Sequence, residues 1–423
     1  MHNAIPSLPT TRREFLRLSG SGLGLLAFST FAPAFLTRAA EANVPAPARD
    51  RRVLVLVQLG GGNDGLNTVV PFADDNYYKL RPRLGFQRST QFSKLNDQIG
   101  LPPTCLPLAR LFNEGKFTVV QNVGYPNPNR SHFRSTEIWE TASDAQTYLS
   151  SGWLGRYVDN CCDGTPSATA DPVAVHGTTT LPQSIQADKP QNYFGIGGNS
   201  RINVRPHPRR DGRAFIPLLD QLAQAPTPAE PAHFLSHTLM DALVTEKRVQ
   251  QILASYRPEK PYPNFPLAQS LQGVAALVAA GLETRVYFCS QPGYDTHSNQ
   301  FNTHQNKLTE LAQSLAAFQS DLEHHGLDKQ VLTMTFSEFG RRPYENDALG
   351  TDHGTAAPLF LMGSALKTPG GIIGQAPDLN IGPQGDLEYK IDFRQIYSTV
   401  LHRWLDADPA KILGQKFQEL PLV

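Results

Sequence analysis

The chain has 423 residues, with 38 basic and 38 acidic side chains and a formal net charge of +0. Because neither charge is in excess, there is no electrostatic case for nucleic acid or an anionic membrane surface as a partner. Charged residues are only 18% of the chain, while glycine and proline number 33 and 34, which is typical of a compact scaffold with many loops.

The N-terminal segment has the three parts of an export signal. Arg12 and Arg13 are adjacent in a basic opening, a weakly apolar run follows, and a small-residue stretch ends near Ala40 or Ala42. This order is typical of a signal peptide, and the paired arginines indicate the twin-arginine (Tat) type. We therefore predict a signal over 1–42, a periplasmic or otherwise exported mature chain, and the Tat translocase as a partner during export.

A retained membrane anchor is the alternative interpretation of the same segment. The apolar run is shorter than the roughly 20 residues that a membrane span needs, and Pro33 interrupts it. We therefore expect no permanent membrane span. The remaining residues, 43–423, have a length typical of one decorated α/β enzyme domain.

The mature chain alternates between strand and helix patterns. Six nearly continuous apolar runs predict strands buried on both faces of a parallel sheet, and helical periodicity is clearest over 304–326 and 393–406. The alternation predicts a doubly wound, mostly parallel α/β sheet. The proline-rich and polar stretch over about 178–262 is interpreted as a helical or loop insertion, or cap. The six predicted strands are 52–59, 117–123, 172–177, 285–290, 331–339 and 358–363.

Polar clusters follow several of these predicted strands. In open α/β sheets, ligands bind outside the carboxyl ends of the strands, so we expect these loops to converge on one crevice. Carboxylate, imidazole and hydroxyl groups are the ligand set for divalent metals such as zinc or manganese. The clusters are GGGNDG with Asp64, NRSHFRSTE with Ser131, GYDTHSNQFNTH with Asp295, His297 and His304, and GTDHGT with Asp352 and His353.

Each cluster also has a plain structural interpretation. Asp64 fits a tight turn that caps a helix, and Ser131 fits a helix N-cap, as readily as either fits a functional role. Asp295 with His297, and Asp352 with His353, lie in glycine-rich loops and favour metal ligation more strongly. The joint occurrence of the four loops favours a metal site over the separate alternatives.

The four cysteines give no sign of a zinc–thiolate site. They are Cys105, Cys161, Cys162 and Cys289, and no CxxC pair occurs among them. One pair could form a disulfide in an oxidising compartment, but the sequence leaves the pairing open.

Together these features resemble the bacterial family called domain of unknown function 1501, which looks like a distant branch of the alkaline phosphatase and sulfatase superfamily. The resemblance covers essentially the whole mature chain and implies an alkaline-phosphatase-like α/β core with two divalent metal ions, of zinc, manganese, magnesium or calcium. The motifs that carry it are the Tat signal, VQLGGGNDGLNTVVPF, NRSHFRSTEIWET, GYDTHSNQ, FSEFGRRPYENDALGTDHG and IDFRQIYSTVLHRWL.

The superfamily pattern implies a metal ligand just after the first strand, an Asp with a nearby His after a later strand, and a consecutive Asp-His pair. The usual spacing of the second element is Asp-x-x-x-His, from which this sequence departs, and the final superfamily histidine has no clear match. Glu338, at a strand end, is a further ligand or a partner of a ligand. The implied metal ligands are Asp64, Asp295, His297, His304, Asp352 and His353.

The same pattern implies a nucleophile at the helix start after the second strand, which matches Ser131, with His132 and Thr136 as substitutes. A nearby metal would lower the pKa of the Ser131 hydroxyl. Guanidinium groups would bind the non-bridging oxygens of the substrate. The candidates for that role are Arg341, grouped with the catalytic residues, and Arg130, Arg134 and Arg342.

The predicted function is therefore an exported metal-dependent hydrolase of phosphate esters in a small molecule or polymer. Sulfate esters are less favoured, because Ser131 is followed by HFR rather than the C/S-x-P-x-R motif of sulfatases. The alternative is a non-catalytic periplasmic metal-binding or scaffold protein that retains the fold.

Overall fold

The computed structural model describes residues 51–161, 171–189, 191, 193–196, 246–368, 371–382 and 384–423. The predicted signal over 1–42 lies outside these residues. Within the described ranges, no helix is long and apolar enough to cross a membrane.

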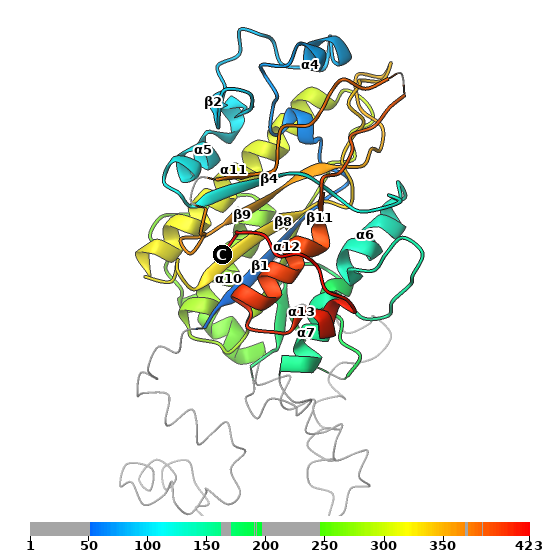
Figure 1. Ribbon diagram of the computed structural model, residues 1–423. Helices are drawn as coiled ribbons and strands as arrows, with labels where there is room; N and C mark the ends of the chain where they lie inside the picture. Colours follow the sequence, from blue (N-terminus) through cyan, green and yellow to red (C-terminus); the bar gives the residue numbers. More distant parts are fainter. Residues whose placement is uncertain are drawn as a thin grey trace, which may run out of the picture. The chain divides into compact units, whose positions relative to one another are not determined.

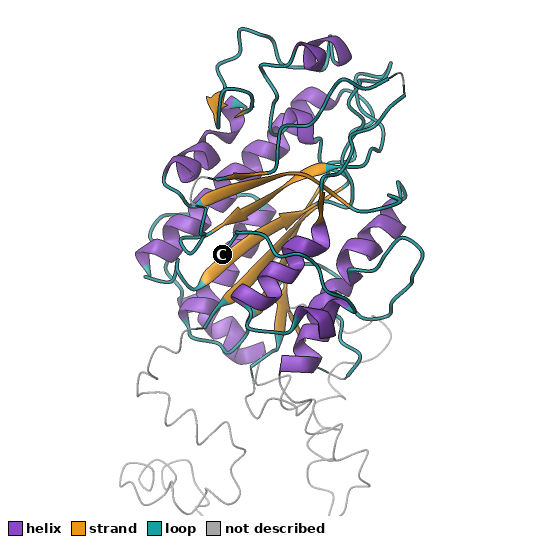
Figure 2. Cartoon of the chain, viewed as in Figure 1, coloured by secondary structure: helices purple, strands orange, loops and turns teal. Residues whose placement is uncertain are grey.

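A nine-stranded sheet forms the centre of the domain, with helices on both faces (Figure 2). Its order is β10-β4-β9-β8-β1-β7-β5-β6, and β11 also pairs with β4. The pairings are parallel except those that β9 makes with β4 and β8. The predicted mostly parallel α/β sheet is thus confirmed. The strands are β1 (Val53–Gly60), β4 (Phe117–Gly124), β5 (Ala174–His176), β6 (Tyr193–Gly195), β7 (Val286–Pro292), β8 (Val331–Phe336), β9 (Ala357–Met362), β10 (Ile372–Ile373) and β11 (Ile391–Asp392).

Strand β9 is the exception to the parallel pattern. Its apolar run, predicted over 358–363, has the same continuous pattern as the parallel strands, because helices cover both faces of the sheet at this position too. A continuous apolar run therefore indicates that both faces of a strand are covered, and it does not indicate the direction of the strand.

Helical layers cover both faces of the sheet (Figure 1), and alternating side chains of β1 pack against one layer and then the other. Val55 and Val57 face the core formed with α5, α10 and α11, whereas Leu54 and Leu56 face the core formed with α6, α7 and α12. Burial of each such side chain stabilises the fold by about 1.5–3 kcal/mol. The layers consist of α5 (Leu106–Asn113), α10 (Pro266–Ala279) and α11 (Gln300–His324) on one side, and α6 (His132–Thr141), α7 (Trp153–Cys161), α12 (Phe393–Thr399), a π-helical turn (Val400–Trp404) and α13 (Pro409–Leu413) on the other.

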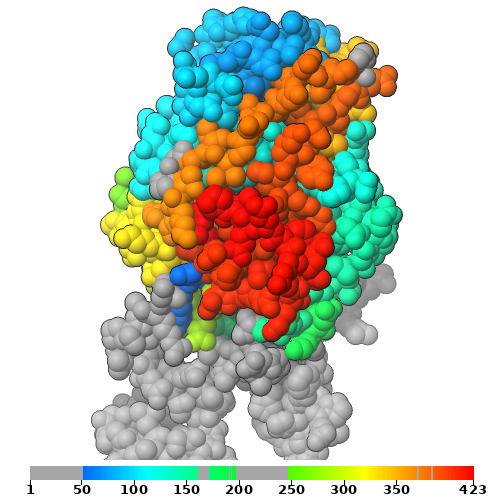
Figure 3. All heavy atoms as spheres, viewed as in Figure 1, coloured from blue at the N-terminus to red at the C-terminus, as the bar shows by residue number. Residues whose placement is uncertain are grey.

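The segment after β9 is the main covering of one face of the molecule, as its orange and red atoms show (Figure 3). The smaller elements lie mostly in the connections. They are α4 (Asp75–Leu80), the hairpin of β2 (Ser93–Lys94) and β3 (Gly100–Leu101), and single turns at Gly65–Asn67, Pro103–Cys105 and Gln183–Ile185.

The stretch interpreted as an insertion is described only in part. Residues Tyr193–Gly195 form β6, the edge strand next to β5, and residues 246–255 are helical. Part of this stretch therefore extends the sheet. Among the described cysteines, Cys105 and Cys289 are buried and free.

Candidate metal centre

The loops that follow β1, β4, β7 and β8 meet at one edge of the sheet, where these parallel strands have their carboxyl ends. Glycines allow the close approach. A Cβ at Gly61 (φ +117°) would lie 2.3 Å from the backbone nitrogen of Asp295, and a Cβ at Gly350 would lie 2.2 Å from the carbonyl carbon of His297. No other residue fits these positions without moving the neighbouring loop.

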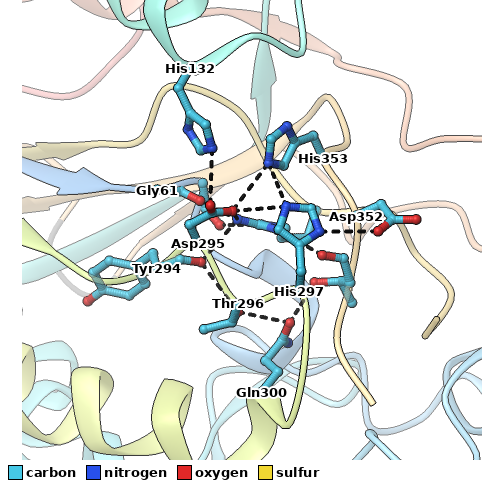
Figure 4. Close-up of polar contacts among 12 residues, drawn as sticks. Gly61, His132, Tyr294, Asp295, Thr296, His297, Gln300, Asp352 and His353 are labelled. Atoms are coloured by element: carbon cyan, nitrogen blue, oxygen red, sulfur yellow. Dashed lines mark hydrogen bonds and ion pairs between the residues drawn. The ribbon is translucent and has the colours of Figure 1, made fainter. Parts of the chain in front are cut away.

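Three histidines surround the Asp295 carboxylate in this crevice (Figure 4). Nε2 of His297 lies 3.1 Å and Nε2 of His353 lies 3.2 Å from Oδ1 of Asp295, and Nε2 of His132 lies 3.5 Å from Oδ2. The Nε2 atoms of His297 and His353 are 2.9 Å apart. We call His132, Asp295, His297 and His353 the open cluster, because Asp295 and His297 are nearly half exposed.

The other ring nitrogen of each histidine faces a hydrogen-bond acceptor. Nδ1 of His353 donates to the carbonyl of Arg130 (2.8 Å), and Nδ1 of His297 donates to Oδ1 of Asp352 (3.2 Å). Nδ1 of His132 lies 2.9 Å from Oε1 of Glu338.

Oε1 of Glu338 already accepts the backbone N–H of Gly61 at 2.8 Å, so it accepts from His132 as well. With the proton on Nδ1 in all three rings, the unprotonated Nε2 atoms point into the cluster. Fixing a ring through Nδ1 in this way is the usual arrangement around metal-ligating histidines.

The open cluster fits a metal ion. Ligand atoms about 2.0–2.1 Å from a tetrahedral zinc lie roughly 3.3 Å apart, close to the separations of 2.9–3.5 Å found here. Nε2 of His132 is buried and has no hydrogen-bond partner among the described residues. Two imidazole lone pairs at 2.9 Å repel each other unless a cation lies between them. His132, Asp295 and His353, whose ligand atoms all lie within 4.8 Å of one another, therefore have the donors and the spacing for a divalent ion, and His297 lies beside them.

The electrostatics of Asp295 favour its charged form. Partial burial raises its pKa, but the hydrogen bond from Arg341 (2.6 Å) and the positive charge of that guanidinium lower the pKa to about 2. Burial lowers the pKa of His353, which favours its neutral form. A carboxylate and a neutral imidazole are the protonation states in which these groups bind metals.

The buried side chain of Arg341 links the loops that surround this crevice. Its guanidinium is buried and donates to the carbonyls of Gly62 (2.8 Å), Thr351 (2.7 Å) and Gly61, and to Asp295. Its donors are thus committed to the protein. Arg341 links the loops and orients Asp295, and it does not present a free guanidinium for a substrate.

Asp64 and His304 lie in a separate buried network. Oδ2 of Asp64 accepts from Arg81 at 2.6 Å and from Gln300 at 2.5 Å, and Nε2 of His304 lies 2.9 Å from Oδ1 of Asn63. Burial raises the pKa of Asp64, but Arg81 more than reverses this and lowers it, and burial lowers the pKa of His304 to about 4. The cation next to Asp64 is thus Arg81. We call Asn63, Asp64, Arg81, Gln300 and His304 the buried network.

The remaining predicted residues lie on the rim or away from it. Ser131 is exposed at the N-cap of α6, one residue before His132, and makes no capping bond. Arg130 pairs with Asp386 at 2.6 Å. Arg342 bonds to the hydroxyl of Tyr344, whereas Arg134 is buried against the carbonyls of Asp144 and Thr147.

Sequence reasoning missed three of these roles. His132 was expected only as a substitute nucleophile, although its place directly after Ser131 at a strand end carried the same signal as the other histidines. Arg81 and Gln300 gave no such signal. Arg81 follows α4 as its C-cap residue, and Gln300 begins a long helix.

The fold and the crevice define a mostly parallel α/β protein with a carboxylate–imidazole cluster at the carboxyl edge of its sheet. Residues 113–418 match the family described as "Protein of unknown function (DUF1501)", and the chain belongs to this family, as the sequence motifs predicted. A comparison with curated proteins finds no match.

Three solved structures show low similarity to this chain, with TM-scores of 0.35–0.36. The C-terminal periplasmic domain of EcEptC from Escherichia coli, in complex with Zn, has a TM-score of 0.36 at 10% identity and covers 75% of this chain and 74% of that one. PsFucS1 sulfatase from Pseudoalteromonas sp. has a TM-score of 0.35 at 10% identity, and the match covers 96% of this chain and 72% of that one. A protein in the alkaline phosphatase superfamily from Vibrio parahaemolyticus has a TM-score of 0.35 at 8% identity, and the match covers 78% of this chain and 64% of that one.

Proposed function

We propose that the chain is an exported metal-dependent hydrolase of phosphate esters, with one divalent ion held by His132, Asp295 and His353, whose ligand atoms all lie within 4.8 Å of one another, and with His297 beside them. The observation that carries this proposal is the convergence of three imidazole Nε2 atoms on one carboxylate, at 3.1–3.5 Å. The exposed sides of Asp295 and His297 leave the cluster open to a substrate.

A bound divalent ion would polarise a phosphoryl oxygen as a Lewis acid. The protein's own contribution is orientation. Glu338, Asp352 and the carbonyl of Arg130 fix the rings of the three histidines, and Arg341 fixes Asp295. This support favours a preorganised site, in which little rearrangement is needed when the ion or substrate binds.

The resemblance implies two ions, whereas the proposal has one. A second ion at Asp64 would lie in a fully buried position beside the Arg81 guanidinium, and His304 of the same network bonds Asn63 and not Asp64, whereas Asp295 is half exposed and faces three imidazoles. Two imidazole nitrogens and one carboxylate oxygen, with a third imidazole nearby, favour zinc over magnesium or calcium, which prefer oxygen ligands, and they leave a fourth position open for a substrate. We therefore propose a single zinc-type centre, with manganese as the second choice.

The phosphoester preference rests on the surroundings of Ser131. The hydroxyl is exposed at the N-terminus of a ten-residue helix, where free backbone N–H groups favour an anion. Arg130 and Arg342 lie close enough to act electrostatically on Asp386 at the rim. In this proposal Ser131 is the nucleophile, and Arg130 and Arg342 bind the non-bridging oxygens of the ester.

The test measures metal content and activity on the same preparations. We expect about one zinc per chain by elemental analysis and cleavage of phosphate monoesters or diesters, but not sulfate esters. Ser131→Ala should retain the metal and lose at least about 100-fold in kcat. Ser150→Ala, at an exposed serine outside the centre, is the matched control.

Full activity in Ser131→Ala would remove the serine from the mechanism and favour attack by water. A chain that binds metal but cleaves no ester would support the alternative of a non-catalytic metal-binding protein. Absence of bound metal after incubation with zinc would overturn the proposal itself.

A further inference from the structure

Gln300 has an unusual position among the buried polar residues of the described chain. It is the first residue of α11, and its side chain is fully buried. Its amide nitrogen donates to Oδ2 of Asp64 at 2.5 Å. Its amide oxygen accepts from the hydroxyls of Thr296 at 3.0 Å and Thr351 at 2.6 Å. One amide group thus contacts three chain segments.

The two threonines belong to the loops that carry the proposed ligands. Thr296 lies between Asp295 and His297 and is labelled beside Gln300 in Figure 4. Thr351 lies two residues before His353. The backbone N–H of Thr351 also donates to the carbonyl of Thr296 at 3.3 Å, so the loops contact each other directly.

The chemistry of the partners fixes which way the amide points. The Thr351 hydroxyl donates to the amide oxygen, and the Thr296 hydroxyl has two acceptors within reach, this oxygen at 3.0 Å and the carbonyl of Tyr294 at 3.3 Å, whereas the ionised Asp64 carboxylate can only accept. The amide oxygen must therefore face the threonines and the amide nitrogen must face Asp64. A glutamate in this position would place a second negative charge against Asp64, and a methionine would provide neither interaction.

Arg81 anchors the far side of this connection. Besides Asp64, it donates to the carbonyls of Pro343 (2.8 Å) and Arg342 (2.9 Å). The Asp64–Arg81 ion pair is therefore fixed to the segment that leads into the Thr351 loop.

We infer that Gln300 is a positioning residue that connects the buried Asp64–Arg81 ion pair to the Asp295–His297 loop and the His353 loop, two of the three segments that carry the open cluster. It contacts none of the proposed ligands itself. It holds the two threonines in register, and this sets the separation between Asp295 with His297 on one loop and His353 on the other. The part that concerns metal binding rests on the proposed function, whereas the ordering of the loops does not.

The first experiment compares hydrogen exchange in the metal-free chain. In Gln300→Met we expect faster amide exchange over residues 294–298 and 350–354, with unchanged protection in the middle of α11. Gln319→Met is the matched control, because Gln319 is also buried in α11 but bonds Glu323 and Ser364, far along the helix. It should leave both loops unchanged.

The second experiment measures zinc affinity by competition with a chelator. Loss of partners that orient metal ligands costs about 10–100-fold in affinity, and we expect the lower end, about 10-fold, for Gln300→Met because it acts through a neighbouring residue. Thr351→Val removes the hydroxyl at nearly constant shape and should weaken zinc binding in the same direction. Thr351→Ser keeps the hydroxyl and should restore the affinity.

The outcomes separate the two proposals. Unchanged exchange in both loops of Gln300→Met would overturn the positioning role, whether or not zinc binds. If Gln300→Met does not fold, equal loop exchange in Thr351→Val and Thr351→Ser would overturn it. Failure of the wild-type chain to bind zinc would overturn the proposed function alone, because the exchange comparison is made without metal. Changed exchange with unchanged zinc affinity would restrict Gln300 to ordering the loops and overturn its part in metal binding.

Discussion

The open cluster and the buried network contain the same chemical groups at the same edge of the sheet, yet they differ in exposure and in what faces the carboxylate. Asp64 is buried beside Arg81, so its negative charge has a resident cation 2.6 Å away. Asp295 has the Arg341 guanidinium at the same distance, but it is half exposed, and three imidazole Nε2 atoms lie 3.1–3.5 Å from its oxygens. A carboxylate with a histidine nearby is therefore an insufficient sign of a metal site. Each carboxylate pairs with a buried arginine, so the exposure of Asp295 and the imidazole nitrogens that face it distinguish the two sites.

Glu140 extends this comparison to a third carboxylate. It is buried at 7% exposure and accepts a backbone N–H from Ser184 at 3.3 Å. Burial without a cationic partner raises its pKa to about 7, whereas Arg81 keeps the pKa of Asp64 low. The neighbouring cation thus decides whether a buried acid stays charged.

Removal of that cation should give the largest effect. Arg81→Met leaves Asp64 charged and buried without its partner, so we expect a loss of about 3–5 kcal/mol in the free energy of unfolding. Denaturant titration measures it. Arg83→Met is the control, because Arg83 is half exposed in its pair with Glu345 and should cost less than about 1 kcal/mol. Equal losses in the two variants would contradict the role given to burial.

The pH dependence of stability should report Glu140. Its folded pKa is raised from 4.5 to about 7, so the folded state binds the proton more tightly than the unfolded state. The contribution of the protonated group is complete below pH 4.5 and is lost as the pH rises to about 7, by about 3 kcal/mol. Glu140→Gln should remove this loss. Unfolding measured at pH 5 and pH 8 should show a smaller difference than in the wild type, and equal differences would refute the shift.

Zinc affinity should separate the two histidine environments. His353→Ala removes a proposed ligand, and we expect affinity to fall by about 100-fold or more, since losing only an outer partner already costs 10–100-fold. His304→Ala, in the buried network, should leave zinc affinity within about 3-fold, although it creates a cavity and lowers stability. If His304→Ala alone abolished binding, the ion would belong in the buried network.

The smallest effect should come from Asp352. It bonds Nδ1 of His297 at 3.2 Å and is exposed on its other side, so we expect Asp352→Asn to weaken zinc binding by about 10-fold. A loss of several hundredfold, measured in the same competition assay, would instead make Asp352 a direct ligand, as the sequence motif implied.

The sequence predicted the parts of the site that depend on strand ends. Asp295, His297 and His353 follow or precede buried strands, and the loops that carry them do meet. What it could not predict is which face of a loop a side chain uses and which distant residue comes to lie beside it. Arg341 follows a strand as expected, but its guanidinium turns inward to backbone carbonyls. Arg81 contacts Asp64 from the end of the short helix α4, and the strand pattern in the sequence provides no reason to place it there.

The position of β9 between β4 and β8 affects when the two sides of the open cluster can meet during synthesis of the chain. In the sheet, β4 reaches the β8-β1-β7 group only through β9. His132 follows β4, whereas Asp295 and His297 follow β7, so the two sides of the cluster join when residues 357–362 take their place between them. A chain still emerging from the ribosome therefore holds the donor groups in two separate pieces. Under the proposed function, the complete cluster can bind an ion only after about six-sevenths of the chain has been made.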